Sequence, residues 1–142
     1  MTRHHYLLPL LLAVALLACR SASTPAVHSA SLDQEIQLAP GEQAVYSQQR
    51  LTVEFVRVVT DSRCPTDATC FWAGEVTVQL AIWTDGAAAV QHEIKAGEHA
   101  TFGEYRLAVV RVEPERVSTR QIAPEEYRVT VKLERANASG SI

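Results

Sequence analysis

Recognisable catalytic signatures are absent from this sequence of 142 residues. It contains no G-x-S-x-G or H-E-x-x-H motif and no glycine-rich loop of the kind that binds phosphate. The histidines at positions 28, 92 and 99 stand apart from one another, and we find no nucleophile paired with a base around them. His92 is in phase with Val90 and Ile94, which predicts a partly buried strand residue, and His99 is expected in a solvated turn. The sequence therefore predicts a protein that is not an enzyme and uses no cofactor.

Long apolar runs are also scarce, and the one at residues 6–18 lies at the start of the chain. It follows the basic stretch Arg3–His5, has the length of the hydrophobic region of a secretory signal, and is too short for a comfortable membrane span. It ends in Leu16–Cys19, which resembles the bacterial lipobox, where signal peptidase II cuts before a diacylglyceryl cysteine. We therefore expect loss of residues 1–18 and a lipid on Cys19. The alternative is an ordinary secretory signal with an incidental cysteine.

The residues after Cys19 predict where the protein is held. Arg20 follows it, and in Gram-negative lipoproteins a residue other than aspartate at this position implies sorting to the outer membrane, with the protein facing the periplasm. Residues 20–31 are small and polar without a hydrophobic period, so we expect residues 19–31 to be the lipidated cysteine and a flexible tether. Twelve such residues reach about 20 Å on average. The domain should then float near the membrane without lying in it.

Positive charge is in short supply as well. Without residues 1–18, which contain one Arg, the chain has 12 basic and 16 acidic residues and a net charge of −4. The basic residues form no block, and binding to a phosphate backbone needs clustered Lys and Arg, so we expect no nucleic acid partner. Eleven of the 13 basic residues of the whole chain are arginines, whose planar guanidinium suits pairing with carboxylates.

What the chain does have, from residue 32 to residue 135, is an alternation of apolar and polar residues with period two. No segment of ten or more residues after the signal has a convincing helical stripe. The pattern predicts a single all-β domain, an antiparallel β-sandwich or partly open barrel of about seven strands. The expected strands are 35–38, 40–46, 50–60, 75–83, 89–94, 105–113 and 126–134.

Two of these strands change their apolar face part of the way along. The change falls after Phe55 in one strand and between Val109 and Val110 in the other, and a one-residue change of face needs a bulge or a bend. Residues 114–125 contain two prolines and are expected to form a crossover loop. Residues 136–142 are expected to be a disordered tail.

The stretch DSRCPTDATCFWAG, residues 61–74, carries the two remaining cysteines. With Cys19 committed to lipid, Cys64 and Cys70 are the one available pair, and outside the cytoplasm two such close thiols are normally oxidised. Closing this small loop should stabilise the fold by roughly 2 kcal/mol. We therefore expect a structural disulfide, and Trp72 is able to pack its indole on it.

Three other roles for this stretch compete with a structural disulfide. A zinc site needs further ligands, and no histidine lies near the cysteine pair in sequence, so no metal is expected. A redox-active pair favours a spacing of two residues at a helix start, whereas the spacing here is five residues in a strand and loop context. Calcium could take oxygens from Asp61, Asp67 and Glu75, but their spacing matches no EF-hand loop.

The segment Asp61–Val78 resembles a sequence motif of known proteins. Its pattern D-S-R-C-P, four residues, C, one residue, W-A-G is similar to a motif of small, uncharacterised bacterial envelope lipoproteins. The flanking sequences LTVEFVRVVT and EYRVTVKL fit the same layout. The resemblance implies an exported β-domain, and the family has no activity to carry over to this chain.

The leading hypothesis is a non-enzymatic cell-envelope lipoprotein in which loop 61–74 is a contact surface for another protein or a glycan. Its candidate contact residues are Arg63, Pro65, Thr66, Asp67 and Trp72. The alternatives are an accessory protein of the envelope, including one that inhibits a hydrolase with an inserted loop, and a periplasmic domain that binds a small ligand or metal. An exposed aromatic at the loop tip would favour a binder, and a concave pocket with convergent polar groups would favour a carrier or an enzyme.

Overall fold

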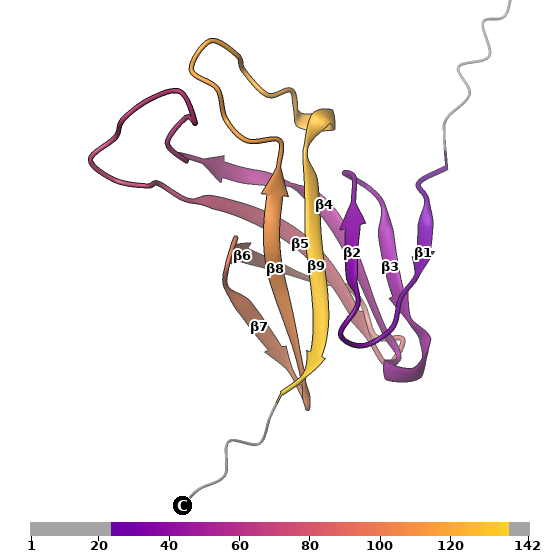
Figure 1. Cartoon of the computed structure of the whole chain (residues 1–142). Helices are drawn as coiled ribbons and strands as arrows, with labels where there is room; N and C mark the ends of the chain where they lie inside the picture. Colours follow the sequence, from indigo (N-terminus) through magenta and orange to yellow (C-terminus); the bar gives the residue numbers. More distant parts are fainter. Residues whose placement is uncertain (1–23, 137–142) are drawn as a thin grey trace, which may run out of the picture.

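The computed structural model describes residues 24–136, which form two β-sheets packed face to face (Figure 1). One sheet has the strand order β1-β3-β4-β5-β6 and the other β2-β9-β8-β7. All strand pairs are antiparallel except β1 with β3, and within residues 24–136 the sheets do not close into a barrel, so the predicted β-sandwich is confirmed. The strands are β1 (Val27–Ser29), β2 (Glu35–Leu38), β3 (Gln43–Tyr46), β4 (Leu51–Asp61), β5 (Val76–Thr84), β6 (Val90–Lys95), β7 (His99–Phe102), β8 (Tyr105–Glu113) and β9 (Arg128–Arg135), with short 3-10 turns η1 (Ser47–Gln49) and η2 (Pro124–Glu126).

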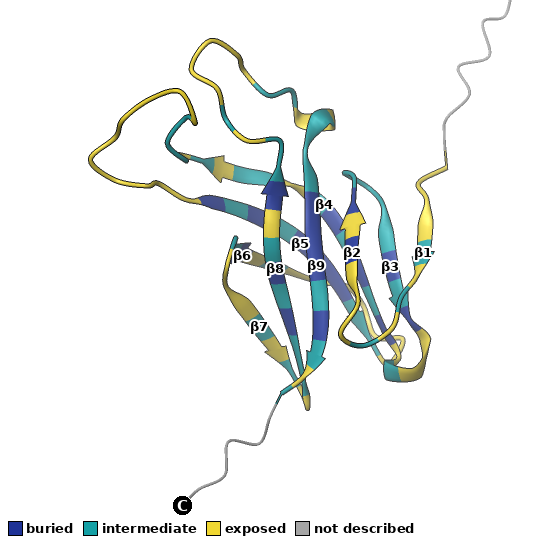
Figure 2. Cartoon of the chain, viewed as in Figure 1, coloured by how far each residue is buried: buried dark blue, intermediate teal, exposed yellow. Residues whose placement is uncertain are grey.

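The core lies between the two sheets, where the alternating apolar side chains meet (Figure 2). In β9 the side chains of Val129, Val131 and Leu133 have no exposed surface, and in β5 the same is true of Val78 and Leu80. Burying each such side chain fully is worth about 1.5–3 kcal/mol relative to leaving it in water. The period-two pattern of the sequence is therefore what selects the inner face of each strand.

Both predicted changes of face are real and coincide with bulges. The register between β4 and β5 shifts between Phe55 and Arg57, and the register between β8 and β9 shifts between Val109 and Arg111. A second shift in β4, between Val58 and Thr60, was not predicted. Because a bulge bends its strand and increases its twist, the last part of β4 turns away from the body of the sandwich.

Two of the strands were not predicted. β7 begins at His99, which was expected in a turn, and its four residues are too few to give a clear alternation. β1, Val27–Ser29, falls inside the expected flexible tether, and that prediction is corrected here. The strand pairs in parallel with β3, and Ala30 donates its backbone N–H to the carbonyl oxygen of Val45 at 3.0 Å. His28 also contacts Glu42, with its Nε2 3.3 Å from the carboxylate. The ordered domain thus begins before residue 32, because backbone pairing holds a segment that has no hydrophobic period.

Two loops are hydrogen-bonded to each other at one end of the sandwich, which we call the loop end (Figure 1, top). The stapled loop, residues 62–75, joins β4 to β5, and the crossover loop, residues 114–127, joins β8 to β9. β1 is parallel to β3, and Val27 pairs with Gln43 at the start of both strands. β4 runs from the partner of Gln43 toward the stapled loop, so the chain enters β1 from the side of the loop end. The predicted signal, Cys19 and most of the predicted tail lie outside the described residues. Within residues 24–136, no helix is long and apolar enough to span a membrane.

We predict that Phe55→Ala lowers the free energy of unfolding by about 3–5 kcal/mol, because this side chain is fully buried and its loss leaves a cavity. Phe71→Ala makes the same chemical change at a fully exposed side chain and should alter the free energy by no more than about 0.5 kcal/mol. Urea titration of both variants, followed by circular dichroism, measures the two values. Similar losses in the two variants would contradict the core described here.

Candidate functional site

The stapled loop is closed by a disulfide between Cys64 and Cys70, whose Cα atoms are 6.0 Å apart, as the sequence predicts. Below the disulfide, the two arms of the loop are joined by backbone hydrogen bonds. Ser62 donates its N–H to the carbonyl oxygen of Glu75, and Cys64 donates to that of Ala73, both at 2.8 Å. The loop is therefore fixed at its neck by the same ladder that pairs β4 with β5, and above the neck by a covalent bond.

Gly74 lets the second arm of the loop pass close to the first. Its φ is +70°, in the left-handed region, and a Cβ built there would lie 1.9 Å from the carbonyl oxygen of Ser62. No side chain fits in that space without moving the backbone. The glycine of the W-A-G sequence is thus required by the close approach of Ser62 and Gly74.

Arg63 holds the first arm of the loop against the crossover loop. Its Nε and Nη2 atoms donate to the two carboxylate oxygens of Asp61 at 2.8 and 2.6 Å. The same guanidinium donates through Nη1 to the carbonyl oxygen of Val112 at 2.7 Å and through Nη2 to that of Pro114 at 3.0 Å. The side chains of Arg63 and Asp61 are 14% and 7% exposed, so this fork joins two loops in a nearly dry environment.

The electrostatics of this ion pair favour its charged form. Burial raises the pKa of the Asp61 carboxyl, but the hydrogen bonds and the positive charge of Arg63 lower it by more in sum, so the pKa lies below its ordinary value. The hydrogen bonds from Arg63 to Asp61 in turn raise the pKa of the guanidinium. The hydroxyl of Tyr127 also donates to Asp61 at 3.1 Å, and burial followed by the negative charge of Asp61 raises the pKa of that phenol. Asp61 therefore stays ionised and fully engaged at neutral pH.

Further bonds connect the two loops beyond this ion pair. Arg116 donates through Nη1 to the carbonyl oxygen of Arg63 at 2.8 Å, and Thr66 donates its N–H to the carbonyl oxygen of Arg116 at 2.8 Å. Asp67 accepts from the N–H and the hydroxyl of Ser118 at 2.8 and 2.6 Å, and these bonds lower the pKa of its carboxyl. The stapled loop and the crossover loop are therefore one hydrogen-bonded unit.

This arrangement divides the five predicted contact residues into two groups. Arg63 is mostly enclosed, Pro65 is half-buried, and Thr66 and Asp67 are exposed but hydrogen-bonded to the crossover loop. Trp72 belongs to the second group. Its side chain is 84% exposed and therefore does not pack on the disulfide, because the backbone at the loop tip directs it to solvent.

Several residues of this unit were not among the predicted site residues. Phe71, whose side chain is fully exposed next to Trp72 in sequence, is one of them. Arg116, Ser118 and Tyr127 had no assigned role, because they lie about fifty or more residues from their partners in sequence. The abundance of arginine over lysine was the one available signal, since it favours planar pairing with carboxylates.

The carboxylates weighed for calcium do not come together. Asp61 is paired with Arg63 and Asp67 with Ser118, and Glu75 lies 2.8 Å from the Nζ of Lys95. In residues 24–136 no group of three or more His, Cys, Asp or Glu side chains is arranged to hold a metal ion.

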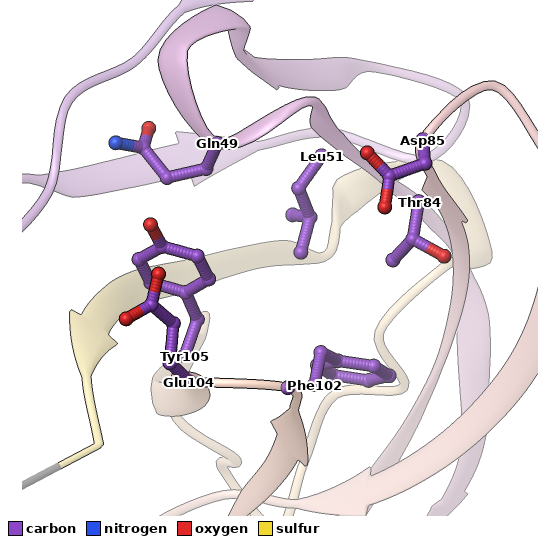
Figure 3. Close-up of a pocket in the computed structure, with 8 residues that line it drawn as sticks. Gln49, Leu51, Thr84, Asp85, Phe102, Glu104 and Tyr105 are labelled. Carbon is purple, nitrogen blue, oxygen red and sulfur yellow. The ribbon is translucent and has the colours of Figure 1, made fainter.

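A hollow of about 400 Å³ lies away from the loop end, near η1 and the turns after β5 and β7 (Figure 3). Leu51, Phe102 and Tyr105 supply its apolar wall. Its two carboxylates have cationic neighbours outside the hollow: Asp85 lies 3.3 Å from Arg50, and Glu104 lies 3.6 Å from Arg135. The lining side chains offer no nucleophile paired with a base. The stapled loop remains the better candidate for a functional site.

We predict that replacing Cys64 and Cys70 together by Ser lowers the melting temperature by about 5–10 °C, since the open loop gains conformational freedom in the unfolded chain. The experiment should use the chain from residue 24 onward, because a start near residue 31 would remove β1. Reduction of the wild type with dithiothreitol should bring its midpoint to that of the double variant and leave the variant unchanged. An unaltered midpoint in the double variant would count against a structural disulfide.

We also predict that Asp61→Asn lowers the free energy of unfolding at pH 7 by about 2–4 kcal/mol, because the Arg63 charge then stays enclosed without its counter-charge. The folded-state pKa of Asp61 is depressed, so its contribution is complete above the unfolded-state pKa of about 3.9 and is lost as the pH falls through the folded-state pKa. The difference in free energy of unfolding between the wild type and the variant should therefore be constant from pH 7 to about pH 5 and should disappear progressively below about pH 4.

Asp85→Asn is the matched control for this measurement. Asp85 also lies beside an arginine, Arg50, but both side chains are about 70% exposed, so its loss should cost no more than about 0.5 kcal/mol at any pH. Urea titrations of the three proteins between pH 3 and pH 7 give the comparison. A gap for Asp61→Asn that persists unchanged to pH 3 would show that its carboxylate charge is not what stabilises the fold.

The chain has also been compared with known proteins. No family model matches it, and no curated protein or solved structure matches it either. The proposal that follows therefore has its support in the geometry of this chain and in the residues of its first twenty positions.

Proposed function

We propose that this chain is a non-enzymatic, lipid-anchored protein of the bacterial cell envelope, whose stapled loop is a contact surface. The observation that carries the proposal is the pair Phe71 and Trp72, two adjacent aromatic side chains of the stapled loop that directly follow the disulfide residue Cys70 and are 103% and 84% exposed. The lipobox resemblance at Leu16–Cys19 supports the anchor and the envelope location.

The exposure of these aromatics is informative because the loop that carries them is rigid. Each aromatic left in water forgoes about 1.5–3 kcal/mol of burial, and adjacent exposed aromatics commonly mark a site of contact. The disulfide, the neck bonds and the Asp61–Arg63 pair fix the loop before anything binds, so little further ordering is needed on contact. Aromatic anchors on a prepared loop are typical of binding surfaces.

The polar groups of the loop end support a structural role over a chemical one. Asp61 and Arg63 bind each other, and Arg63 also donates to the carbonyl oxygens of Val112 and Pro114. Asp67 binds Ser118. A catalytic acid or base would need a free face toward a substrate. A hollow of about 220 Å³ does lie at the loop end, but the carboxylate that lines it, Asp61, already accepts from Arg63 and Tyr127, which favours a contact protein over the carrier alternative.

The proposal predicts that p-benzoyl-phenylalanine in place of Phe71 forms a covalent adduct when intact cells are irradiated. The matched control is the same amino acid in place of Val90, which is 57% exposed at the other end of the sandwich and should give no adduct. Gel shift and mass spectrometry of the purified protein identify any adduct. Absence of an adduct at position 71, with normal amounts of folded protein, would refute the contact surface.

A further inference from the structure

Large exposed apolar side chains are unevenly distributed over residues 24–136. Of the five, Phe71, Trp72 and Val117 belong to the loop end, Val90 lies at the other end, and Val27 lies between them, level with Glu54 of β4. Val117 precedes Ser118, which is bonded to Asp67 of the stapled loop, so it belongs to the same hydrogen-bonded unit as the aromatic pair. One end of the domain is thus more apolar than the other.

The loop tip itself has the composition of a segment that enters an apolar phase. Residues 68–74 are all exposed and contain no charged side chain. Trp72 has an apolar ring system and one N–H donor, a combination that favours the boundary between membrane and water. The charged residues of the stapled loop, Arg63, Asp67 and Glu75, are each bonded elsewhere in the structure.

The N-terminal segment enters the domain from the same end. The chain enters β1 from the side of the loop end, because β1 runs parallel to β3, and β3 runs antiparallel to β4, which runs toward the stapled loop. Val27 itself is level with Glu54 of β4. Cys19 lies five residues before residue 24, where the described chain begins, and five residues span at most about 17 Å. A lipid on Cys19 would therefore hold the loop end, and not the opposite end, toward the bilayer.

We propose that the partner of this contact surface is the lipid bilayer, with Phe71 and Trp72 inserted into its interface. This inference deepens the proposed function and rests on its lipid anchor. It replaces the picture of a domain that floats at the end of a long tether, since β1 takes up part of the segment expected to be flexible.

The charges of the loop end define the kind of membrane contact. Residues 62–75 and 114–127 together contain three basic and five acidic residues. Attraction to anionic lipids needs a basic surface, so the contact is apolar and independent of anionic lipid. A zwitterionic bilayer is therefore sufficient, and added salt should leave the contact intact.

The two tryptophans of the chain allow a direct test. Trp72 lies at the loop tip, and Trp83 lies near the far end of β5, opposite Thr52. Trp83→Phe leaves Trp72 as the one reporter, and Trp72→Phe leaves Trp83 as the matched control. The full lipidated protein is reconstituted into phosphatidylcholine vesicles whose acyl chains carry bromine, which quenches indole fluorescence at close range.

We expect about twofold quenching of Trp72 with a shift of its emission to shorter wavelength, and no quenching of Trp83. Adding phosphatidylglycerol or 0.5 M salt should not change either value by more than about a tenth. Phe71→Ala, which removes a fully exposed side chain, should leave the fold intact and weaken the quenching of Trp72. Quenching of Trp72 no greater than that of Trp83 would overturn the inference.

Flotation of the same vesicles and the mass of the mature N-terminal peptide separate the two proposals. Protein that carries lipid on Cys19 and floats, but whose Trp72 is not quenched, leaves the anchor standing and overturns the membrane contact. Protein without lipid that stays at the bottom of the gradient overturns both. A protein or glycan adduct at position 71 in irradiated cells supports a contact surface and refutes the bilayer as its partner.

Discussion

The guanidinium of Arg63 is the group on which the arrangement of the loop end depends. It contacts the end of β4, the last residues of β8 and the start of the crossover loop, through Asp61 and the carbonyl oxygens of Val112 and Pro114. A lysine could not replace it, because a single ammonium cannot meet a carboxylate in two parallel bonds and two carbonyl groups at the same time. Further hydrogen bonds between the stapled loop and the crossover loop are made by Thr66, Asp67 and Arg116.

The features that the sequence predicts well are those with a local cause. Alternation of apolar residues placed seven of the strands, and the face changes near Phe55 and Val109 located two bulges, because the side chain period of a strand is a property of neighbouring residues. The pairing of Cys64 with Cys70 followed from the small number of available cysteines and their separation along the chain.

The features that escaped prediction depend on distant parts of the chain. β1 has no hydrophobic period of its own, and it is a strand because the edge of β3 is free to pair with it. The role of Arg63 depends on two backbone carbonyl groups about fifty residues away, and backbone groups leave no trace in a sequence. The direction of Trp72 is set by the path of the loop tip, which no pattern of residue types encodes.

The parallel pairing of β1 with β3 has a mechanical consequence. When tension is applied to residue 24 along the axis of β1, it loads the hydrogen bonds at Ala26 and Ala30 at the same time instead of opening them one after another. A short strand loaded in shear in this way resists extraction better than one peeled from its end. The pairing of β1 with β3 can thus bear a force on the N-terminal segment before that force unfolds the two packed sheets.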